Sequence, residues 1–242
     1  MSNGLKVTAK YVKNMRKLLF FLLLAGCCVF DTTFTGQSFL GVPYMNSPLG
    51  EGVMPDSDPL IRFDAFDCTT FVETVLAGGD VNKLNKIRYK NGNVGFLNRN
   101  HFIESDWLIN NADLVENVSA RYADTDVRHV VIDKQSWFKK VHNIDAYLEP
   151  VEIDLEYIPY HNVKDIKIDK MMIVLFVADK PKIHDNIGTD LAVFHMGLLF
   201  PNGILRHASS EHKKVIDADF AEYVAERMKN KTNLGIVLVE IK

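Results

Sequence analysis

Four apolar segments near the end of the chain constrain its fold more strongly than any other feature. Each is short, rich in β-branched residues and followed by polar or turn-forming residues, a pattern typical of β-strands. They occupy residues 171–177, 192–200, 204–209 and 233–241. Pro201-Asn202-Gly203 separates the middle two and suits a three-residue hairpin loop, with glycine in the left-handed conformation. The sequence therefore predicts a β-hairpin in this region.

Two histidines interrupt the apolar pattern of this hairpin. A three-residue loop pairs Phe200 with Ile204, which places His195 opposite Ser209 and diagonal to His207 on the same face. A two-residue loop would separate the two imidazoles onto opposite faces. Taken alone, the hairpin is equally consistent with two histidines that have purely structural roles.

Cys68 lies at the start of a predicted helix. Apolar residues recur at helical spacing until Gly78-Gly79 ends the run: Phe71, Val72, Val75 and Leu76. Thr70 and Glu73 form a capping-box signature at its beginning. A thiol at a helix N-terminus is close to the positive end of the helix dipole, which favours the thiolate. The alternative is a buried structural cysteine, because cysteine is among the most buried residue types.

Cys68, His195 and His207 together fit an activated nucleophile. In such a site an imidazole serves as base and then as acid, and a third group holds that imidazole in one tautomer. A zinc ion with the same three ligands is an alternative, since three protein ligands and an open position make a catalytic zinc geometry. No close ligand pair such as HExxH or CxxC accompanies them. We therefore expect no metal and no cofactor.

The N-terminus predicts export. Basic residues precede the apolar run of residues 18–25, which is shorter than the roughly 20 residues that span a bilayer. Leu24-Ala25-Gly26-Cys27 resembles a bacterial lipobox, so we expect residues 1–26 to be a signal peptide and Cys27 to carry lipid. Secretion without lipid, or a retained helix, are the alternatives. The membrane is then a partner only through that lipid.

The remaining chain reads as one domain. Residues 27–40 are predicted to be a tether, residues 31–62 are loop-rich, and residues 41–242 are expected to form a single domain with an insertion at about 81–165. Further helices are predicted near 103–111, 135–147 and 220–228. A net charge of −3 with dispersed basic residues argues against nucleic acid as a partner. We expect no disulfides, because Cys68 is the only cysteine beyond Cys28. We also expect a monomer.

Several motifs in order resemble the NlpC/P60 cysteine peptidase superfamily, and more narrowly its DUF1460 branch of N-acetylmuramoyl-L-alanine amidase-like proteins. The resemblance covers about residues 35–240, and its main motifs are Gly41-Val42-Pro43-Tyr44, Phe66-Asp67-Cys68-Thr69-Thr70-Phe71-Val72-Glu73, His195-Met196-Gly197 and His207-Ala208-Ser209-Ser210. Residues 168–171 depart from the pattern, since the family usually has Gly-Asp there. The resemblance implies a papain-like α+β fold, with the nucleophile Cys68 at a helix N-terminus packed on a mainly antiparallel sheet that carries the histidines.

The same resemblance implies a cell-wall hydrolase. Its substrates would be peptidoglycan fragments, cut between the lactyl group of N-acetylmuramic acid and L-alanine, preferentially in anhydromuropeptides, by a lipid-anchored periplasmic protein. His195 would act as base and His207 would orient it. Substrate contacts are expected from Tyr44, Arg99, Asn100, His101 and Ser209. The alternatives are an endopeptidase that cuts between D-glutamate and diaminopimelate, a silent cell-wall binding lipoprotein, and thiol acyltransfer to lipids.

Overall fold

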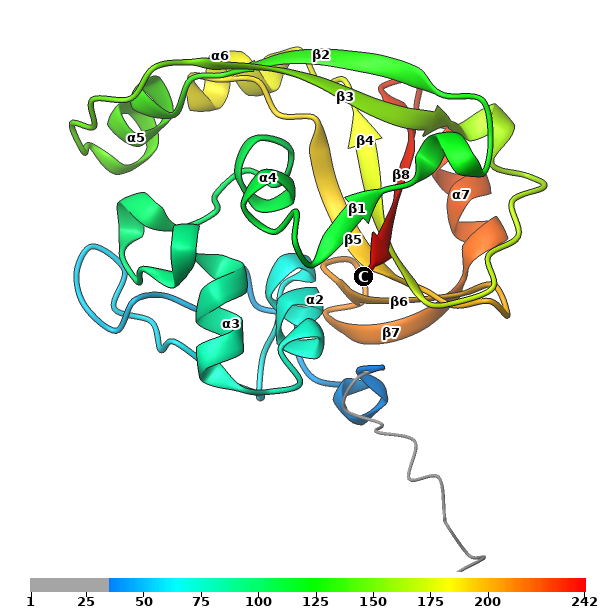
Figure 1. Cartoon of the computed structure of the whole chain (residues 1–242), viewed down its shortest axis with the longest axis horizontal. Coiled ribbons are helices and arrows are strands. Elements are labelled where there is room, and N and C mark those ends of the chain that lie inside the picture. Colours follow the sequence, from blue (N-terminus) through cyan, green and yellow to red (C-terminus); the bar gives the residue numbers. More distant parts are fainter. Residues whose placement is uncertain (1–34) are drawn as a thin grey trace, which may run out of the picture. The chain divides into compact units, whose positions relative to one another are not determined.

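The computed structural model describes residues 35–242, and an eight-stranded sheet organises this part of the chain (Figure 1). The strand order is β2-β3-β8-β4-β5-β6-β7, and β1 pairs with β8 outside this path. Every named pairing is antiparallel. The predicted α+β class with a mainly antiparallel sheet is therefore confirmed. The predicted signal peptide, Cys27 and most of the tether lie outside the described residues.

The four predicted apolar strands form the adjacent central strands of the sheet. They are β4 (Met172–Ala178), β5 (Val193–Leu199), β6 (Ile204–Ser209) and β8 (Asn233–Ile241). Every residue of β4 is buried. A strand covered on both faces needs apolar residues at successive positions, which explains why these segments read as continuous apolar runs.

The sequence did not predict the remaining strands. These are β1 (Val115–Asn117), β2 (Asp126–Ile132), β3 (Val151–Pro159) and β7 (Lys214–Asp219). β2 and β7 end the strand order, and β2, β3 and β7 expose part of one face to solvent. Polar residues are tolerated on such a face, so the apolar signal is diluted. β1, β2 and β3 all fall in the predicted insertion, yet they belong to this same sheet.

Helix α2 (Cys68–Leu76) begins one residue earlier than the apolar pattern indicated, and its cap differs from the prediction. Asp67 is the N-cap: its Oδ1 accepts a hydrogen bond from the backbone N–H of Thr70, 2.7 Å away, and Thr70 Oγ1 accepts one from the N–H of Asp67. The predicted Thr70–Glu73 capping box is therefore wrong. The reciprocal pair is shifted by three residues, which places Cys68 at the first helical position.

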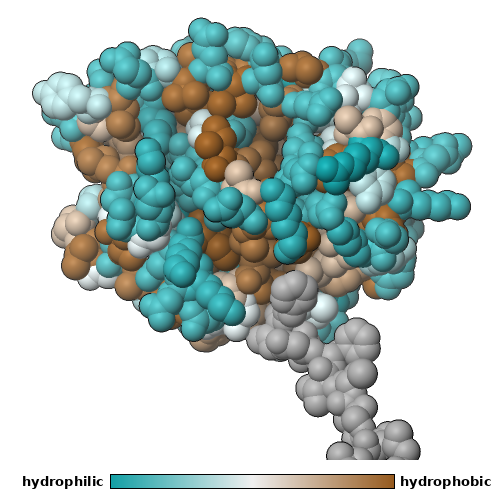
Figure 2. All heavy atoms as spheres, in the orientation of Figure 1, coloured by the Kyte–Doolittle hydropathy of each residue, from teal (hydrophilic) through white to brown (hydrophobic). Residues whose placement is uncertain are grey.

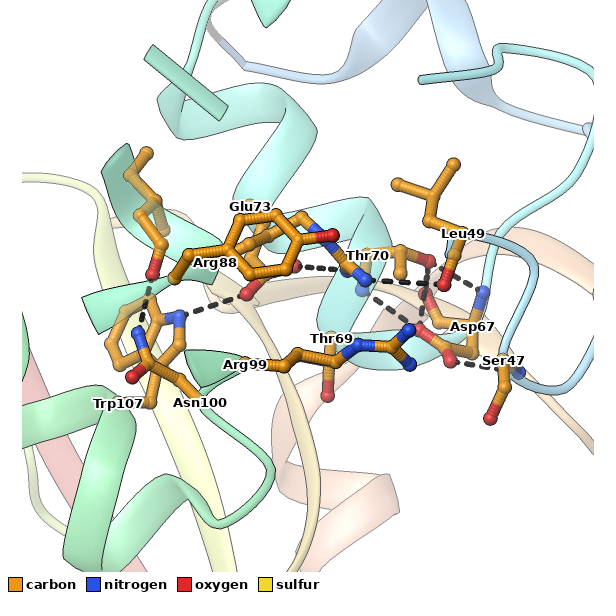
Figure 3. Close-up of polar contacts among 12 residues, drawn as sticks. Ser47, Leu49, Asp67, Thr69, Thr70, Glu73, Arg88, Arg99, Asn100 and Trp107 are labelled. Atoms are coloured by element: carbon orange, nitrogen blue, oxygen red, sulfur yellow. Dashed lines mark hydrogen bonds and ion pairs between the residues drawn. The ribbon is translucent and has the colours of Figure 1, made fainter. Parts of the chain in front are cut away.

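Glu73 is buried and makes tertiary contacts (Figure 3). Its Oε2 accepts a hydrogen bond from Arg88 at 2.8 Å, and its Oε1 accepts one from Trp107 Nε1 at 3.1 Å. Arg88 ends helix α3 (Val81–Arg88) and also donates to the carbonyl of Leu49. Glu73, which the sequence pattern assigned to the helix cap, instead joins α2 to α3 and to the segment before α4.

Other helices cover the sheet or its edges. They are a π-helical turn at Ile103–Trp107, α4 (Leu108–Asn110), α5 (Lys134–His142), α6 (Lys182–Ile187) and α7 (Phe220–Met228). The prediction for 220–228 is confirmed, whereas the helix expected to reach residue 147 ends at His142 and is capped by Asn143, whose φ is 55°. Short 3₁₀ segments occupy Gln37–Phe39, Lys90–Gly92, Phe96–Asn98, Ser119–Arg121 and Tyr160–Asn162. Within residues 35–242 no helix is long and apolar enough to cross a membrane.

Two apolar clusters lie on opposite faces of the central strands. Ile173 and Leu175 point to the cluster that includes Phe71 of α2. Val174 points to the other, which includes Phe220 and contains side chains of α7. Because side chains alternate along a strand, the sheet buries apolar side chains on both faces. The surface in the view of Figure 2 is largely hydrophilic, with apolar patches between the polar side chains.

Candidate active site

The hairpin of β5 and β6 has the predicted register. Leu198 pairs with Arg206 and Leu199 with Leu205, and the N–H of Phe200 donates to the carbonyl of Ile204 at 2.9 Å. Gly203 in the loop has a φ of 78°, the left-handed conformation that glycine adopts without strain. The three-residue loop is confirmed, and with it the same-face placement of the two histidines.

His195 and His207 are hydrogen-bonded to each other, with Nε2 of His195 2.7 Å from Nδ1 of His207. In neutral imidazoles one of these nitrogens donates and the other accepts, so the contact fixes complementary tautomers. The two ring centroids are 4.8 Å apart in an edge-to-face arrangement. Nδ1 of His195 is thereby left for another partner, as the orientation of a catalytic base requires.

Gly197 allows this close approach of β6 to β5. A Cβ on Gly197 would lie 3.0 Å from Cβ of His207, 3.0 Å from the carbonyl oxygen of Arg206 and 2.9 Å from Leu205 Cδ1. Backbone and Cβ atoms do not yield to such contacts as flexible side-chain ends do. The glycine of the His-x-Gly motif therefore provides the space that His207 occupies.

Cys68 reaches the same site from the other side of the hairpin. Helix α2 packs on β5 and β6, and Cys68 and His195 line one pocket of about 190 Å³ together with Thr69 and Phe194. The sequence-based expectation that the helix start favours the thiolate does not hold in this structure. Burial, and next the Asp67 carboxylate, raise the pKa of the Cys68 thiol to about 11, although hydrogen bonds from the backbone N–H groups of Met196 and Thr69 oppose this.

Both histidines have lowered pKa values. Burial is the largest cause for each, since it disfavours the charged imidazolium; it lowers the pKa of His207 to about 4 and that of His195 well below its usual value. The neighbouring His207 and the Arg227 cation lower the pKa of His195 further. At neutral pH the site therefore holds a neutral thiol beside two neutral imidazoles.

Tyr44 and Ser209, both predicted as substrate contacts, lie at this site. Burial raises the pKa of Tyr44, and the charges of Cys68 and Asp67 contribute, so the phenol is close to the thiol. Ser209 lines a second pocket with His195 and His207, and its hydroxyl is 3.1 Å from Nδ1 of His212.

Of the three consecutive residues predicted to contact substrate, Arg99 does not line the pocket of Cys68, whereas Asn100 and His101 do. Arg99 Nε and Nη2 donate to the carboxylate of Glu51 at 2.9 and 2.7 Å, and Nη2 also donates to Asp56 at 2.7 Å. The guanidinium of Arg99 is therefore already engaged by two acids of the chain.

Asn100 and His101 are themselves held firmly. Asn100 is buried and its Nδ2 donates to the carbonyl of Ile87 at 2.8 Å. His101 Nε2 is 2.7 Å from the carbonyl oxygen of Phe96, and burial lowers the pKa of this histidine to about 3. Both side chains are thus neutral and fixed in place, and Asn100 also accepts a hydrogen bond from Asn110 through its Oδ1.

Sequence reasoning missed two residues of α7. The ring of Tyr223 has its centroid 5.3 Å from that of His207 and 6.2 Å from that of His195. Arg227, one turn later, places its guanidinium carbon 4.6 Å from the centre of the Tyr223 ring. The sequence marked this segment only as a helix, and no local pattern connects it to the hairpin.

Metal ligands need a compact group of donors. Among residues 35–242 no group of three or more His, Cys, Asp or Glu side chains is arranged to hold a metal ion. Cys68, His195 and His207 therefore do not form such a group.

A thiol at a helix start that shares a pocket with one member of a hydrogen-bonded histidine pair defines a candidate thiol hydrolase site. The family model described as N-acetylmuramoyl-L-alanine amidase-like matches residues 34–233. The chain belongs to this amidase-like family, a family of cell-wall hydrolases, and the resemblance to the DUF1460 branch is confirmed. No curated protein matches the sequence.

Solved structures agree with this assignment. A Legionella pneumophila protein of the DUF1460 family superposes with a TM-score of 0.78 at 23% identity, covering 99% of this chain and 97% of that one. An N-acetylmuramoyl-L-alanine amidase from Bacteroides uniformis gives a TM-score of 0.65 at 25% identity, over 88% of this chain and 98% of its own. A second structure of that description is 27% identical with a TM-score of 0.63, over 86% and 97%.

Proposed function

We propose that the protein is an N-acetylmuramoyl-L-alanine amidase that cuts the amide between the lactyl group of a muropeptide and L-alanine, with Cys68 as nucleophile. The observation that carries this proposal is the 2.7 Å contact between His195 and His207 beside a pocket shared by His195 and Cys68. The Bacteroides uniformis relatives bear the name of the same activity. We further propose that the domain has the papain-like NlpC/P60 fold.

The first step begins from a neutral thiol and a neutral imidazole, as their pKa shifts require. Nδ1 of His195 takes the thiol proton while the sulfur attacks the lactyl carbonyl carbon, so a C–S bond forms and the π electrons move to oxygen. His207 accepts the hydrogen bond of Nε2 and so keeps His195 in the tautomer whose Nδ1 is free. A thiol pKa of about 11 makes this base necessary at neutral pH.

The tetrahedral oxyanion needs preorganised donors. The candidates are the backbone N–H of Cys68, at the first position of α2, and the hydroxyl of Tyr44. Tyr44 is included because it lies close enough to Cys68 for the thiolate charge to raise the pKa of the phenol. The oxyanion then collapses, the C–N bond breaks, and the imidazolium of His195 gives its proton to the alanine nitrogen. The peptide leaves with a free amino terminus.

Hydrolysis of the thioester completes the cycle. His195 removes a proton from water, the oxygen attacks the thioester carbon, and the C–S bond breaks as Cys68 regains the proton. The products are the sugar acid and the regenerated enzyme. No cofactor enters any step.

We also propose that the protein acts outside the cytoplasm, in the periplasm, where peptidoglycan fragments occur. The support is the apolar run of residues 18–25 that ends in the lipobox-like Leu24-Ala25-Gly26-Cys27. Intact mass of the protein from its native membrane checks this: a chain that begins at Cys27 and carries acyl chains agrees, and an unmodified full-length chain does not.

The test of the activity uses residues 28–242 and an anhydromuramyl tetrapeptide, with products identified by mass spectrometry. Free anhydromuramic acid sugar plus intact tetrapeptide, absent with Cys68→Ala and His195→Ala, is the expected result. A sugar-dipeptide product would show instead that the enzyme cuts after D-glutamate. Full activity in either variant, or none in the wild-type chain, would overturn the proposal.

A further inference from the structure

A second pocket, of about 210 Å³, adjoins the first at Phe194 and His195. It is lined on one side by the hairpin and on the other by α7, and two cationic residues, Lys180 and Arg227, contribute to its wall. His195 thus lies between two recesses. A substrate that is cut beside His195 has space on both sides of it.

The two cations have no acidic partner. Every other arginine among residues 35–242 forms an ion pair with a carboxylate, and within this described part Arg227 and Lys180 form none. Each is instead placed over an aromatic ring: Lys180 Nζ is 3.9 Å from the centre of Phe194, and Arg227 stacks on Tyr223. Cation–π contacts hold a cation in place without neutralising it.

Because the two cations are only partly buried, a ligand can reach them. Because they are partly removed from water, their charges are unfavourable when no anion is bound. Lys180 and Arg227 are both half-buried, and burial together with the Arg227 charge lowers the pKa of Lys180. Two like charges this close repel each other, so an anion between them removes an unfavourable interaction. Glu211 also lines the pocket, but it is exposed and forms no ion pair with either cation.

The pocket of Cys68 has the opposite character. Its polar lining comes from Thr69, Asn100 and His101 besides the catalytic pair, and the low pKa of His101 keeps that imidazole neutral. Neutral hydroxyls and amides suit a sugar, whose groups are uncharged. Carboxylates suit paired cations, with which they form charge-assisted hydrogen bonds.

We propose that Lys180 and Arg227 form a carboxylate subsite that binds the peptide stem of the muropeptide and so orients the substrate across His195. The proposal rests on the proposed amidase function. The stem carries the D-glutamate carboxylate and further carboxylates, whereas the muramyl sugar carries none. The charged stem therefore lies over β5 and α7, and the sugar lies in the pocket of Cys68. Arg99 differs from these two cations, because it is already paired with Glu51 and Asp56.

The test measures binding directly, so that it does not depend on turnover. The protein is the chain of residues 28–242 with Cys68→Ala, the probe is the tripeptide L-Ala-γ-D-Glu-diaminopimelate, and the readout is titration calorimetry. We expect Lys180→Gln and Arg227→Gln each to weaken binding about tenfold, the size of one charge-assisted hydrogen bond. The tripeptide with its carboxylates converted to carboxamides should bind weakly and equally to all three proteins.

Lys229→Gln is the matched control, because Lys229 follows α7 and its exposed ammonium pairs with Glu226 away from the pocket. It should bind the tripeptide as tightly as the parent. Thermal unfolding of each variant shows whether it is folded, and the carboxamide comparison needs no variant. The proposal is overturned if the parent binds the tripeptide and its carboxamide equally, binds neither, or loses nothing on removal of either cation. If binding behaves as expected while the wild-type chain cleaves no muropeptide, the subsite stands and the amidase assignment fails.

Discussion

Nε2 of His195 lies 2.7 Å from Nδ1 of His207, across neighbouring strands of one hairpin. The contact makes His207 a hydrogen-bond partner of the imidazole that shares a pocket with the thiol. His207 Nε2, on the far side of its ring, is buried and has no partner. A residue that can accept one hydrogen bond from His195 should therefore retain part of the activity when it replaces His207.

We predict that His207→Asn retains more activity than His207→Ala. The Oδ1 atom of asparagine can occupy the place of Nδ1 and accept from His195, whereas alanine leaves His195 free to rotate and to adopt the wrong tautomer. His195→Ala should lose about 10²-fold or more in kcat, the usual contribution of a general acid-base residue. The measurement is kcat and KM on the muropeptide for all three variants; equal activity of the alanine and asparagine variants would contradict an orienting role.

The pH profile of kcat/KM should extend to acid. His195 must be neutral to act as base, and burial lowers the pKa values of both imidazoles, that of His207 to about 4. A base with a lowered pKa is fully active above that pKa and loses activity only as the pH falls through it. We therefore expect the acid limb to lie below pH 6.5, the usual histidine value, when rates are measured between pH 4 and 8. An acid limb at or above pH 6.5 would show that the imidazoles are not desolvated.

Asp67→Asn should lower the pKa of the Cys68 thiol. The Asp67 charge is the second cause of its rise to about 11, and asparagine keeps the Oδ1 acceptor that caps α2. Alkylation by iodoacetamide, followed against pH, should shift to lower pH, at a stability cost of about 1 kcal/mol or less because the cap persists. Asp64→Asn is the control, since Asp64 is exposed and pairs with Arg62. If both variants are alkylated with the same pH profile as the wild type, Asp67 does not act on the thiol.

Gly197→Ala should damage the site through packing alone. The added methyl group meets the Cβ of His207 and the Arg206 carbonyl at 3.0 Å, so β6 must move from β5, at a cost of about 1–3 kcal/mol. Urea unfolding should show that loss, and kcat should fall because His207 no longer reaches His195. Gly203→Asn, in the open hairpin loop where asparagine tolerates a positive φ, should change stability by less than about 1 kcal/mol. Equal stability of the two variants would contradict the proposed role of Gly197.

Removing one member of the buried Glu73–Arg88 pair should destabilise the fold strongly. Both side chains are buried, so Glu73→Gln leaves an uncompensated charge, at a cost of about 3–5 kcal/mol. The double variant Glu73→Met with Arg88→Met removes both charges and should be more stable than the single variant. Urea midpoints of the wild type, Glu73→Gln and the double variant measure this, and a double variant that is no more stable than Glu73→Gln would argue against the cost of an uncompensated charge.

Local signals were enough to predict the parts of the site that lie close together in sequence. The loop of Pro201-Asn202-Gly203 sets the hairpin register, and that register brings the two histidines onto one face. The helix that begins at Cys68 followed from apolar spacing and its glycine stop. Each of these depends on residues within a few positions of one another, where turn chemistry and periodicity act.

The remaining features depend on tertiary contacts that no local pattern records. Glu73 had the spacing of a capping acid, but Arg88 and Trp107 compete for its carboxylate. The thiol pKa rises because other segments exclude water from Cys68. Tyr223 contacts the histidines only because α7 folds over the sheet.

The two imidazoles lie on one hairpin, whereas the thiol lies on a distant helix, and this difference bears on the order in which activity and structure are lost. Closing a three-residue loop loses little chain entropy, so the two imidazoles are brought together by residues that are close in sequence. The thiol belongs to α2, far earlier in the chain, and meets this hairpin where α2 packs on β5 and β6. Moderate heat or denaturant should therefore separate nucleophile from base while the histidine pair persists, and inactivation should precede loss of the sheet.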